Sequence, residues 1–527
     1  MKTTPQSLVE YADGLSESYN RTHGIEERKP KGQIFTHKRV SRYMAGLLSL
    51  RKKTIRLLDP GAGTGILTAA FCERLLDKST PVTLTIDAYE NDPNLVHVLN
   101  KVLEFCKRRL KEKGHTVKYT ICEKDFILHN HGYFRDLSLF WQEDKPRLYD
   151  IVISNPPYYK LNKDSPQSSA MAKLVSGQPN IYALFMGLAT RMTKPGGELV
   201  FITPRSFCSG LYYKKFRHWF IKNAKITNIH MFESRKDVFD KDGILQENVI
   251  IKATVGAKPN HVAITVSKDK TFTKVTKLKA EWEDVIAKKN GDIFIRIPSS
   301  HLDLDILRTI DKWPTTLNQM GLEISTGPVV DFRAKEYLLP ERTQEPASAP
   351  LLWMHNLQDG KVKWPLKKNN KPSAIQDCQR TKHLLLPVKN YVLVKRFTAK
   401  EQKRRLYAAL FLESEFPCDS IGIENHLNYV HKPKANLSLF ESYGIAAILN
   451  STVIDNFFRS LNGNTQVNAT DIRSVPLPTM QDIIEIGRQV FQAHAHNDQY
   501  KIDEILGQSL GINPEIIHKL RGERNNE

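Results

Sequence analysis

The amino-acid sequence predicts an α/β fold with a doubly wound, mixed and mostly parallel sheet in the N-terminal half of the chain. Two observations lead to this prediction. Short apolar runs that are typical of buried strands alternate with longer helical stretches. A glycine-rich turn also follows the first of these runs directly, at the position where doubly wound sheets bind ligands. With 527 residues, the chain should form two or three domains.

The expected elements alternate regularly along the N-terminal half. The expected strands are 54–58, 83–89, 117–122, 149–154 and 197–203. The expected helices are 64–76, 94–110 and 181–192. Two further apolar runs, 226–232 and 249–255, are joined by a polar segment and are expected to form an edge hairpin.

The pattern changes after residue 255, to short strand-like pieces and then to proline-rich connections. We therefore predict a boundary region between the α/β domain and a second domain. The predicted ranges are an N-terminal segment at 1–30, a main α/β domain at 31–257, a connecting region at 258–312 and a second domain at 313–527.

The composition is that of a globular protein with a strongly basic surface. A formal charge of +20 at pH 7 and an isoelectric point near 9.4 favour binding to polyanions, and nucleic acid is the leading candidate partner. The six cysteines are scattered without a C-x-x-C pair, so we expect reduced thiols and no metal site. The N-terminus has no apolar signal region, and no stretch approaches the roughly 18 apolar residues of a membrane span. A cytoplasmic protein without membrane contact is expected.

The glycine-rich turn begins at Asp59, after the first expected strand. Gly61, Gly63 and Gly65 let the backbone turn sharply and approach a ligand without clashes from Cβ atoms. Glu90 lies at the carboxyl end of the next strand, where one carboxylate can accept hydrogen bonds from two ribose hydroxyls. Enzymes that bind NAD use the same pair of features, so the turn and Glu90 leave the choice of cofactor open.

The fourth expected strand ends at Asn155-Pro156-Pro157-Tyr158, and this tetrapeptide has a specific chemistry. The lone pair of an amine on an aromatic ring is delocalised, so methyl transfer to it requires a more tetrahedral nitrogen. The Asn155 side-chain carbonyl and the Pro156 backbone carbonyl can accept hydrogen bonds from such an amine, and the two prolines fix the loop. Tyr158 offers an aromatic face on which a purine removed from the duplex can stack.

In these motifs and in their order, the sequence resembles the gamma class of DNA adenine-N6 methyltransferases of type II restriction-modification systems. The resemblance covers most of the chain. It implies a Rossmann-like class I methyltransferase domain, with S-adenosylmethionine as cofactor and no metal, and a C-terminal α+β domain that recognises the DNA target. The 31–257 domain is then the catalytic domain, and the 313–527 domain is the target-recognition domain.

The resemblance also implies roles for individual residues. Thr36 corresponds to a residue near the methionine carboxylate of the cofactor, although the family usually has proline at the next position, where this chain has His37. Glu90 corresponds to the acid that binds the ribose, and Asp125 to a residue near the adenine of the cofactor. The implied cofactor-binding set is Thr36, Asp59, Gly61, Gly63, Gly65, Glu90, Asp125 and Asn155.

A second aromatic ring is implied by the segment before the apolar run at 249–255. The family places a ring there against the displaced adenine, and Phe239 is the matching residue. The implied catalytic set is Asn155, Pro156, Tyr158 and Phe239. This arrangement requires that the adenine leaves the base stack before it is methylated.

A basic run in the second domain is the predicted site of contact with DNA phosphates. It is interleaved with Phe397 and Tyr407, and the cations suit contacts to the backbone of the duplex. The predicted DNA-binding residues are Lys395, Arg396, Lys400, Lys403, Arg404 and Arg405. The segments 324–327 and 462–468 resemble recurring parts of the family's target-recognition domain.

Three other functions stay open on sequence grounds. Protein-glutamine methyltransferases also use Asn-Pro-Pro-Tyr, but they would need neither the second domain nor the charge of +20. Adenine in RNA and a catalytically silent DNA-binding protein are further alternatives. Double-stranded DNA is the expected partner, the protein is expected to be a monomer, and a cognate restriction endonuclease is expected as a separate chain.

Overall fold

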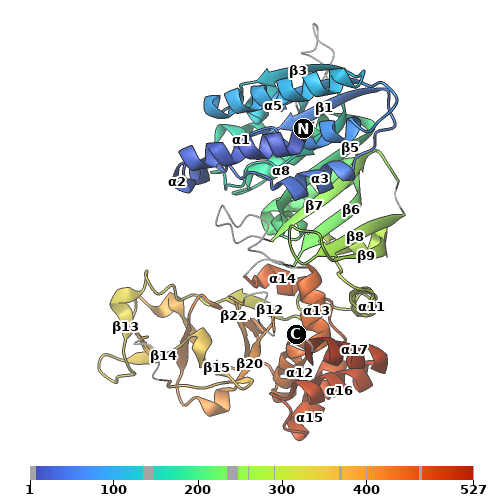
Figure 1. Ribbon diagram of the computed structural model, residues 1–527. Coiled ribbons are helices and arrows are strands. Elements are labelled where there is room, and N and C mark those ends of the chain that lie inside the picture. The colour runs from blue at the N-terminus through green and yellow to red at the C-terminus, as the bar shows by residue number, and fades with distance from the viewer. Residues whose placement is uncertain are drawn as a thin grey trace. The chain divides into compact units, whose positions relative to one another are not determined.

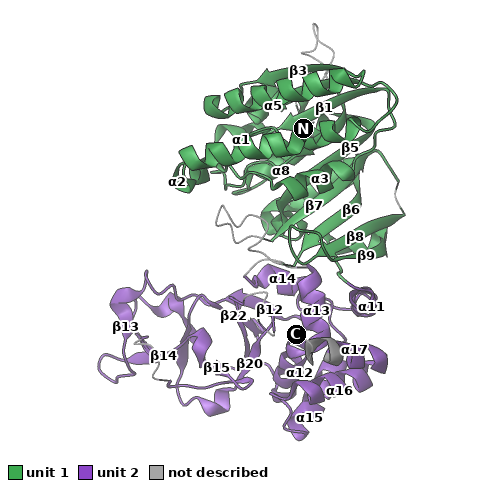
Figure 2. Cartoon of the chain, in the orientation of Figure 1, with its two compact units in different colours: residues 1–299 green, residues 300–527 purple. Residues whose placement is uncertain are grey.

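The computed structural model describes residues 7–134, 148–233, 247–258, 260–289, 291–366, 371–398, 402, 404–461 and 466–525. The chain forms two compact units, residues 1–299 and residues 300–527 (Figure 2). The four domain ranges inferred from the sequence stay predictions.

A nine-stranded sheet organises unit 1 (Figure 1). Its strand order is β3-β2-β1-β4-β5-β7-β6-β8-β9. The strands are β1 (Thr54–Pro60), β2 (Thr83–Tyr89), β3 (Thr116–Cys122), β4 (Tyr149–Ser154), β5 (Thr193–Pro204), β6 (Ala224–Phe232), β7 (Asn248–Val255), β8 (His261–Ser267) and β9 (Val275–Glu281). Strands β1 to β5 pair in parallel, whereas β7 runs antiparallel to both β5 and β6. The predicted mixed, doubly wound sheet is therefore confirmed.

The helices of unit 1 lie mostly between the strands in sequence, as expected for this topology. They are α1 (Leu8–Thr22), α2 (Ile25–Arg28), α3 (Lys38–Gly46), α4 (Ile66–Leu75), α5 (Pro93–Glu112), α6 (Phe126–Asn130), α7 (Pro166–Ala170), α8 (Ile181–Arg191), α9 (Lys214–Asn223) and α10 (Trp282–Val285). A short hairpin of β10 (Ile286–Lys289) and β11 (Asp292–Ile295) completes the unit. Helices α4, α5 and α8 confirm the three helices expected from the sequence.

A continuous hydrophobic core joins α1, α3, α4 and α5 to one face of the sheet. Because side chains alternate along a strand, Leu57 of β1 belongs to this core, whereas its neighbour Leu58 does not. All six residues of β4 are buried, as expected for a strand in the middle of a parallel sheet. The ends of β1, β2 and β4 are thereby held by packing on both sides.

The predicted edge hairpin is wrong in one respect. Strands β6 and β7 do pair with each other antiparallel, but β8 pairs in parallel with the other side of β6, and β9 follows β8. The segment 261–281, which the sequence places in a connecting region, therefore extends the sheet. Its strand β9 is short and mostly exposed, with Lys277 and Lys279 on the outer side, so it carries little apolar signal.

Unit 2 contains two mixed sheets and a group of helices (Figure 1). Its strands are β12 (Glu323–Thr326), β13 (Leu338–Leu339), β14 (Ser348–Leu352), β15 (Leu357–Gln358), β16 (Lys361–Val362), β17 (Ala374–Gln376), β18 (Leu385–Pro387), β19 (Tyr391–Lys395), β20 (Ala408–Phe411), β21 (Ser420–Ile423) and β22 (Leu427–His431). Its helices are α11 (His301–Ile310), α12 (Leu439–Asn450), α13 (Thr452–Leu461), α14 (Ala469–Arg473), α15 (Met480–Gln492), α16 (Gln499–Leu510) and α17 (Pro514–Asn525). Within the described part of the chain, no helix has both the length and the apolar character that crossing a bilayer requires.

Candidate functional site

The carboxyl ends of β1, β2 and β4 meet at one edge of the sheet. Strand β1 pairs with β2 as far as Pro60 and Tyr89, and it pairs with β4 on its other side. The Ser154 hydroxyl at the end of β4 donates a hydrogen bond to the Pro60 carbonyl oxygen at 2.6 Å. The glycine turn, Glu90 and Asn155 therefore come together, as expected at the edge where parallel strands end.

These segments line a cavity of about 530 Å³. Predicted cofactor-binding residues among its lining are Thr36, Gly61, Gly63, Glu90, Asp125 and Asn155. Asp59 and Gly65 do not line the cavity. Its volume lies within the usual range for small-molecule sites, and its walls combine aromatic side chains with carboxylates and backbone amides.

The glycine turn wraps closely against its neighbours. Gly61, Gly63 and Gly65 all have positive φ angles, of 74°, 56° and 82°. A Cβ atom on Gly65 would lie 2.7 Å from the Leu99 side chain of α5, so this glycine allows α4 and α5 to pack. Gly61 and Gly63, in contrast, form the cavity wall.

Glu90 is held in place by backbone donors. Its Oε2 accepts a hydrogen bond from the Gly63 amide at 2.9 Å, and its Oε1 accepts one from the Asp92 amide at 3.0 Å. Burial raises the pKa of Glu90, and these backbone donors oppose that shift. Each carboxylate oxygen can accept a second hydrogen bond, so two ligand hydroxyls could still be bound.

Asp59 lies behind the turn and does not reach the cavity. Its side chain is fully buried, and its Oδ2 accepts a hydrogen bond from the Thr68 hydroxyl of α4 at 2.6 Å. Its other oxygen has no hydrogen-bond partner among the described residues. Burial raises the pKa of Asp59 to about 7, so any influence on a ligand would pass through the turn and α4.

Substitution of Asp59 by Asn should remove a pH dependence of stability. Because the folded-state pKa is raised to about 7 from an ordinary 3.8, ionisation of Asp59 destabilises the folded protein progressively between about pH 4 and pH 7. The full effect amounts to about 4 kcal/mol, from roughly 1.4 kcal/mol for each pKa unit. Urea unfolding without cofactor should therefore show the Asp59→Asn variant gaining stability over the wild type from pH 5 to pH 8. A pH-independent difference would contradict this assignment.

The Asn155 carboxamide has a defined orientation. Its Nδ2 donates hydrogen bonds to the Ile34 carbonyl oxygen at 2.8 Å and to Thr36 Oγ1 at 3.1 Å. A backbone carbonyl can only accept, so these partners place the NH₂ group toward residues 34–36. Oδ1 is thereby kept as an acceptor.

Tyr158 contacts the Asn155 side chain and stabilises its orientation. Its hydroxyl is hydrogen-bonded to the Ile202 carbonyl oxygen of β5 at 2.8 Å and to Asn155 Oδ1 at 2.5 Å, and its single proton is shared between these two acceptors. Burial raises the pKa of Tyr158, so its hydroxyl stays protonated around neutral pH. The ring is partly buried against the core, and it meets Tyr182 edge-on at a centroid distance of 6.3 Å. Tyr158 does not line the cavity itself.

Asp92 is a site residue that the sequence did not reveal. Its Oδ2 accepts hydrogen bonds from Lys31 Nζ at 2.9 Å and Gln33 Nε2 at 2.8 Å, and its Oδ1 caps α5 through the Asn94 amide. Burial would raise the pKa of Asp92, but the Lys31 and Gln33 hydrogen bonds hold it below its ordinary value. The Asp92-Pro93 pair is a recognisable helix start, but its contacts to residues 31 and 33 have no local signal.

His37 occupies the position where the family usually has proline. The φ angle of His37 is −65°, the value that a proline ring enforces, and its Nδ1 accepts a hydrogen bond from the Arg39 amide at the start of α3. Burial lowers the pKa of His37, which favours the neutral form that can accept this bond. The turn after Thr36 is therefore stabilised by a side-chain cap.

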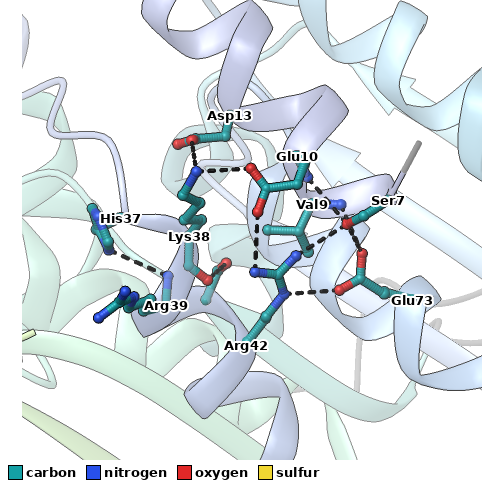
Figure 3. Close-up of polar contacts among 10 residues, drawn as sticks. Ser7, Val9, Glu10, Asp13, His37, Lys38, Arg39, Arg42 and Glu73 are labelled. Carbon is teal, nitrogen blue, oxygen red and sulfur yellow. Dashed lines mark hydrogen bonds and ion pairs between the residues drawn. The ribbon is translucent and has the colours of Figure 1, made fainter. Parts of the chain in front are cut away.

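Polar contacts tie α1, α3 and α4 together beside this turn (Figure 3). Lys38 of α3 contacts Glu10 at 2.7 Å and Asp13 at 3.2 Å, both on α1. Arg42 contacts Glu10 and also donates to Glu73 of α4 at 2.8 Å (Figure 3). The residues before 31, to which the sequence assigns no role, thus brace the segment that holds Asn155.

Helix α1 also reaches the glycine turn directly. The buried Ser16 hydroxyl of α1 lies 2.6 Å from the Thr64 hydroxyl, and α1 packs on both α4 and α5. Tyr19 of α1 meets Phe35 edge-on at 5.7 Å, and Phe35 in turn lies against Gly63. Helix α1 therefore packs behind the cavity wall, against Thr64 and Phe35, which line the cavity.

A Gly32→Ala substitution should lower the activity of this site about tenfold. Gly32 has a φ angle of 65°, which costs an L-residue roughly 1–2 kcal/mol, and a Cβ atom there would lie 2.8 Å from the Tyr159 ring and 3.1 Å from the Tyr158 amide. The 31–36 segment would have to shift away from Asn155. Steady-state kinetics should show the loss, whereas Gly24→Ala, at an open position with φ of −64°, should behave like the wild type. Equal activities would show that the close approach is unimportant.

The remaining predicted residues are Asp125 and those of the basic run. Asp125 lines the cavity, caps α6 through the Leu128 amide at 2.8 Å and accepts a hydrogen bond from Gln167 Nε2 at 3.0 Å.

In the basic run, Lys395 lies over the Tyr407 ring at 4.0 Å, and Arg396 donates a hydrogen bond to the Asn425 carbonyl oxygen. Phe239, Lys400, Lys403 and the segment 462–465 lie outside the described residues.

Arg405 requires a correction. Its side chain is only 1% exposed, and its guanidinium donates a hydrogen bond to the Thr398 carbonyl oxygen. Its backbone amide donates to Asp455 Oδ1 at 2.6 Å. Because a phosphate cannot approach a group in this position, Arg405 belongs to the interior of unit 2 and not to the predicted DNA-binding surface. Arg404, its neighbour, is half-buried.

Comparison with known proteins places the chain among restriction-modification enzymes. The family model described as Eco57I restriction-modification methylase matches residues 82–239. The chain is 35% identical to the type II methyltransferase M.PstI of Providencia stuartii, over 96% of this chain and 98% of that protein. It is 33% identical to the type II methyltransferase M.BsuBI of Bacillus subtilis, over 92% of this chain and 95% of that protein. The solved structure of the type IIL restriction-modification enzyme MmeI shares the fold, with a TM-score of 0.55 and 11% identity over 97% of this chain and 77% of that chain.

Proposed function

Because this chain belongs to the type II restriction-modification methyltransferase family and is a DNA methyltransferase, we propose that it transfers a methyl group from S-adenosylmethionine to N6 of adenine in duplex DNA. The observation that carries this proposal is the orientation of Asn155. Its NH₂ group is engaged by Ile34 and Thr36, so Oδ1 is an acceptor, and it keeps one lone pair beside the bond from the Tyr158 hydroxyl.

Two acceptors side by side suit an exocyclic amine. Asn155 Oδ1 and the Pro156 backbone carbonyl would each accept one hydrogen bond from N6, which draws the nitrogen toward a tetrahedral geometry and makes its lone pair available. Neither group has to gain or lose a proton during the transfer. The proton that N6 loses after methylation passes to water.

The cavity fits S-adenosylmethionine by its chemistry. Glu90 has spare acceptor capacity for the ribose hydroxyls, while Asp125 and Phe126 offer an acceptor and a ring for an adenine. Thr36 and the amides of the glycine turn would hold the amino-acid end. When bound, the sulfonium group supplies an electrophilic methyl. The residues of the chain would position the cofactor and the accepting amine and supply hydrogen bonds, and the transfer would need no metal.

Access to this site favours base flipping. Asn155 follows a fully buried strand and lies in the wall of the cavity. An adenine within a base stack could not reach it there. Tyr158, and Phe239 as its proposed counterpart, would flank the displaced base. Unit 2 is proposed as the target-recognition domain, with the proposed phosphate contacts Lys395, Arg396, Lys400, Lys403 and Arg404.

The proposal is tested by locating the transferred methyl group. The purified protein is incubated with S-adenosylmethionine labelled in its methyl group and with plasmid DNA, and the DNA is then digested to nucleosides. N6-methyladenine is the expected product, and single-molecule sequencing then gives its sequence context. Label in another base would overturn the adenine assignment. Parallel reactions with RNA and with protein should remain unlabelled.

We propose that the methylation protects DNA from a cognate restriction endonuclease encoded as a separate chain, and that the methyltransferase acts as a monomer. Plasmid isolated from cells that express this protein should resist cleavage by an endonuclease of the same sequence specificity. Sedimentation should give the mass of one chain, 60.3 kDa.

A further inference from the structure

Two large apolar side chains are exposed on the short helix η4 (Leu211–Tyr213), which follows β5 in the sequence. Ring contacts connect this helix to the tetrapeptide Asn155-Pro156-Pro157-Tyr158, which we name the acceptor loop. The Leu211 side chain is 59% exposed and the Tyr212 side chain is 52% exposed. Neighbouring exposed apolar residues of this size often mark a surface that another molecule covers. We name Leu211, Tyr212, Lys214 and Lys215 the η4 surface.

The η4 surface is attached to the acceptor loop by stacked aromatic rings. Tyr213, the buried third residue of η4, stacks on Tyr182 with ring centroids 5.6 Å apart and an interplanar angle of 18°. Tyr182 in turn meets Tyr158 edge-on. Leu211 and Tyr212 therefore flank a buried ring, Tyr213, that packs through Tyr182 against the proposed catalytic residue Tyr158. This packing fixes the position of the exposed pair relative to Asn155.

A second loop supports Tyr212 from the side. Gly177 has a φ angle of 69°, and a Cβ atom there would lie 2.6 Å from the Tyr212 ring. The ring thus rests on the backbone of the segment 159–178, which follows the Asn-Pro-Pro-Tyr tetrapeptide. This support leaves about half of the Tyr212 side chain open to solvent.

The charges around the exposed pair suit a polyanion. Lys214 and Lys215 are exposed, and neither forms an ion pair with another described residue. The segment 159–178 adds the exposed Lys160, Lys163 and Lys173. Asp164 is the only carboxylate in the segments 159–178 and 205–223. An apolar pair flanked by cations, in a protein that acts on DNA, matches the composition of elements that enter a duplex groove.

We propose that the η4 surface is a DNA-contacting element of unit 1, in which Lys214 and Lys215 contact phosphates while Leu211 and Tyr212 press into the duplex beside the displaced adenine. The phosphate contacts depend only on the protein being a DNA methyltransferase. The role of the apolar pair rests on the proposed function, because it assumes that a base leaves the stack.

Two double variants separate these roles. Lys214→Gln with Lys215→Gln should weaken duplex binding about tenfold near physiological salt and make the slope of log Kd against log salt shallower by about 2, since each phosphate contact contributes about 0.9. Leu211→Ala with Tyr212→Ala should leave the salt slope unchanged and reduce the fluorescence rise of 2-aminopurine at the target position severalfold. Binding is measured by fluorescence anisotropy with the full chain.

Matched controls come from exposed residues elsewhere. Lys277→Gln with Lys279→Gln removes two exposed lysines of unit 1 on the edge strand β9, and Tyr500→Ala removes a tyrosine of unit 2 that is 53% exposed. Both controls should behave like the wild type. Melting temperature and S-adenosylmethionine binding should be unchanged in all four proteins.

The outcomes distinguish failure of the inference from failure of the proposed function. If the wild type gives a 2-aminopurine response and both η4 variants match it in response and in salt slope, the inference is wrong. A variant that changes melting temperature or oligomeric state without changing DNA affinity would show a packing surface instead. The lysine variant could weaken DNA binding while the wild type gives no 2-aminopurine response. That result would contradict the proposed base flipping but support the proposed phosphate contacts of Lys214 and Lys215.

Discussion

An Asn155→Ala variant should lose methylation by a factor of about 100 to 1,000, while binding of the duplex is largely retained. The substitution removes Oδ1, the side-chain acceptor for the amine, and leaves only the Pro156 carbonyl. Because the interaction strengthens as N6 becomes tetrahedral, the loss should fall on kcat and not on KM. Single-turnover rates at saturating DNA and cofactor, with separate binding titrations, measure it.

An Asn155→Asp variant separates the two functions of the carboxamide. It keeps an acceptor oxygen but loses the donors to the Ile34 carbonyl and Thr36, and it places a carboxylate oxygen against that carbonyl. We expect a rate between those of the wild type and the alanine variant, with weaker cofactor binding. A single-turnover rate for Asn155→Ala within threefold of the wild type would refute the assigned role.

A Tyr158→Ala variant should reduce occupancy of the displaced base in the site by about 10-fold to 100-fold. Stacking of a base on an aromatic side chain contributes roughly 1–3 kcal/mol, and the variant also loses the hydroxyl bound to the Ile202 carbonyl. The fluorescence of 2-aminopurine at the target position should fall accordingly, and the apparent KM for DNA should rise.

Tyr158→Phe is the matched control, because it keeps the ring and removes only the hydroxyl. A hydrogen bond of this kind contributes about 0.5–1.5 kcal/mol, so the phenylalanine variant should lose less than about tenfold in rate. Should the alanine variant keep the full fluorescence response, the stacking role would be excluded. An equal loss in both variants would instead assign the effect to the hydroxyl and its position beside Asn155 Oδ1.

The fold of unit 1 was largely predictable because its central strands are buried on both faces. Such strands are continuous apolar runs, and β4, with every residue buried, is the clearest example. The outer part of the sheet was less predictable. Strand β9 exposes alternate lysines and buries few residues, so its sequence resembles a loop, and the hairpin of β6 and β7 was wrongly placed at the edge.

The convergence of the glycine turn, Glu90 and Asn155 could be predicted because parallel strands end at one edge of a sheet. Contacts between distant side chains could not. The bonds of Asp92 to Lys31 and Gln33 join residues about 60 positions apart, and nothing in either local sequence indicates them. Arg405 shows the same limit, since the charge pattern of the basic run gives no sign that the guanidinium binds the Thr398 carbonyl and that the backbone amide binds Asp455 in the interior of unit 2.

The tether between Asn155 and residues 34–36 has a consequence for protein engineering. An asparagine carboxamide has nearly the same shape when it is turned by half a rotation, and only its neighbours decide which end faces a substrate. Here the neighbours lie about 120 positions earlier in the chain. A tetrapeptide transplanted alone into another scaffold would bring the ring, the prolines and the Tyr158 hydroxyl bond to Oδ1, but it would lose both acceptors that bind the NH₂ group. The transferable unit is the tetrapeptide together with the 31–36 segment and the aspartate that holds it.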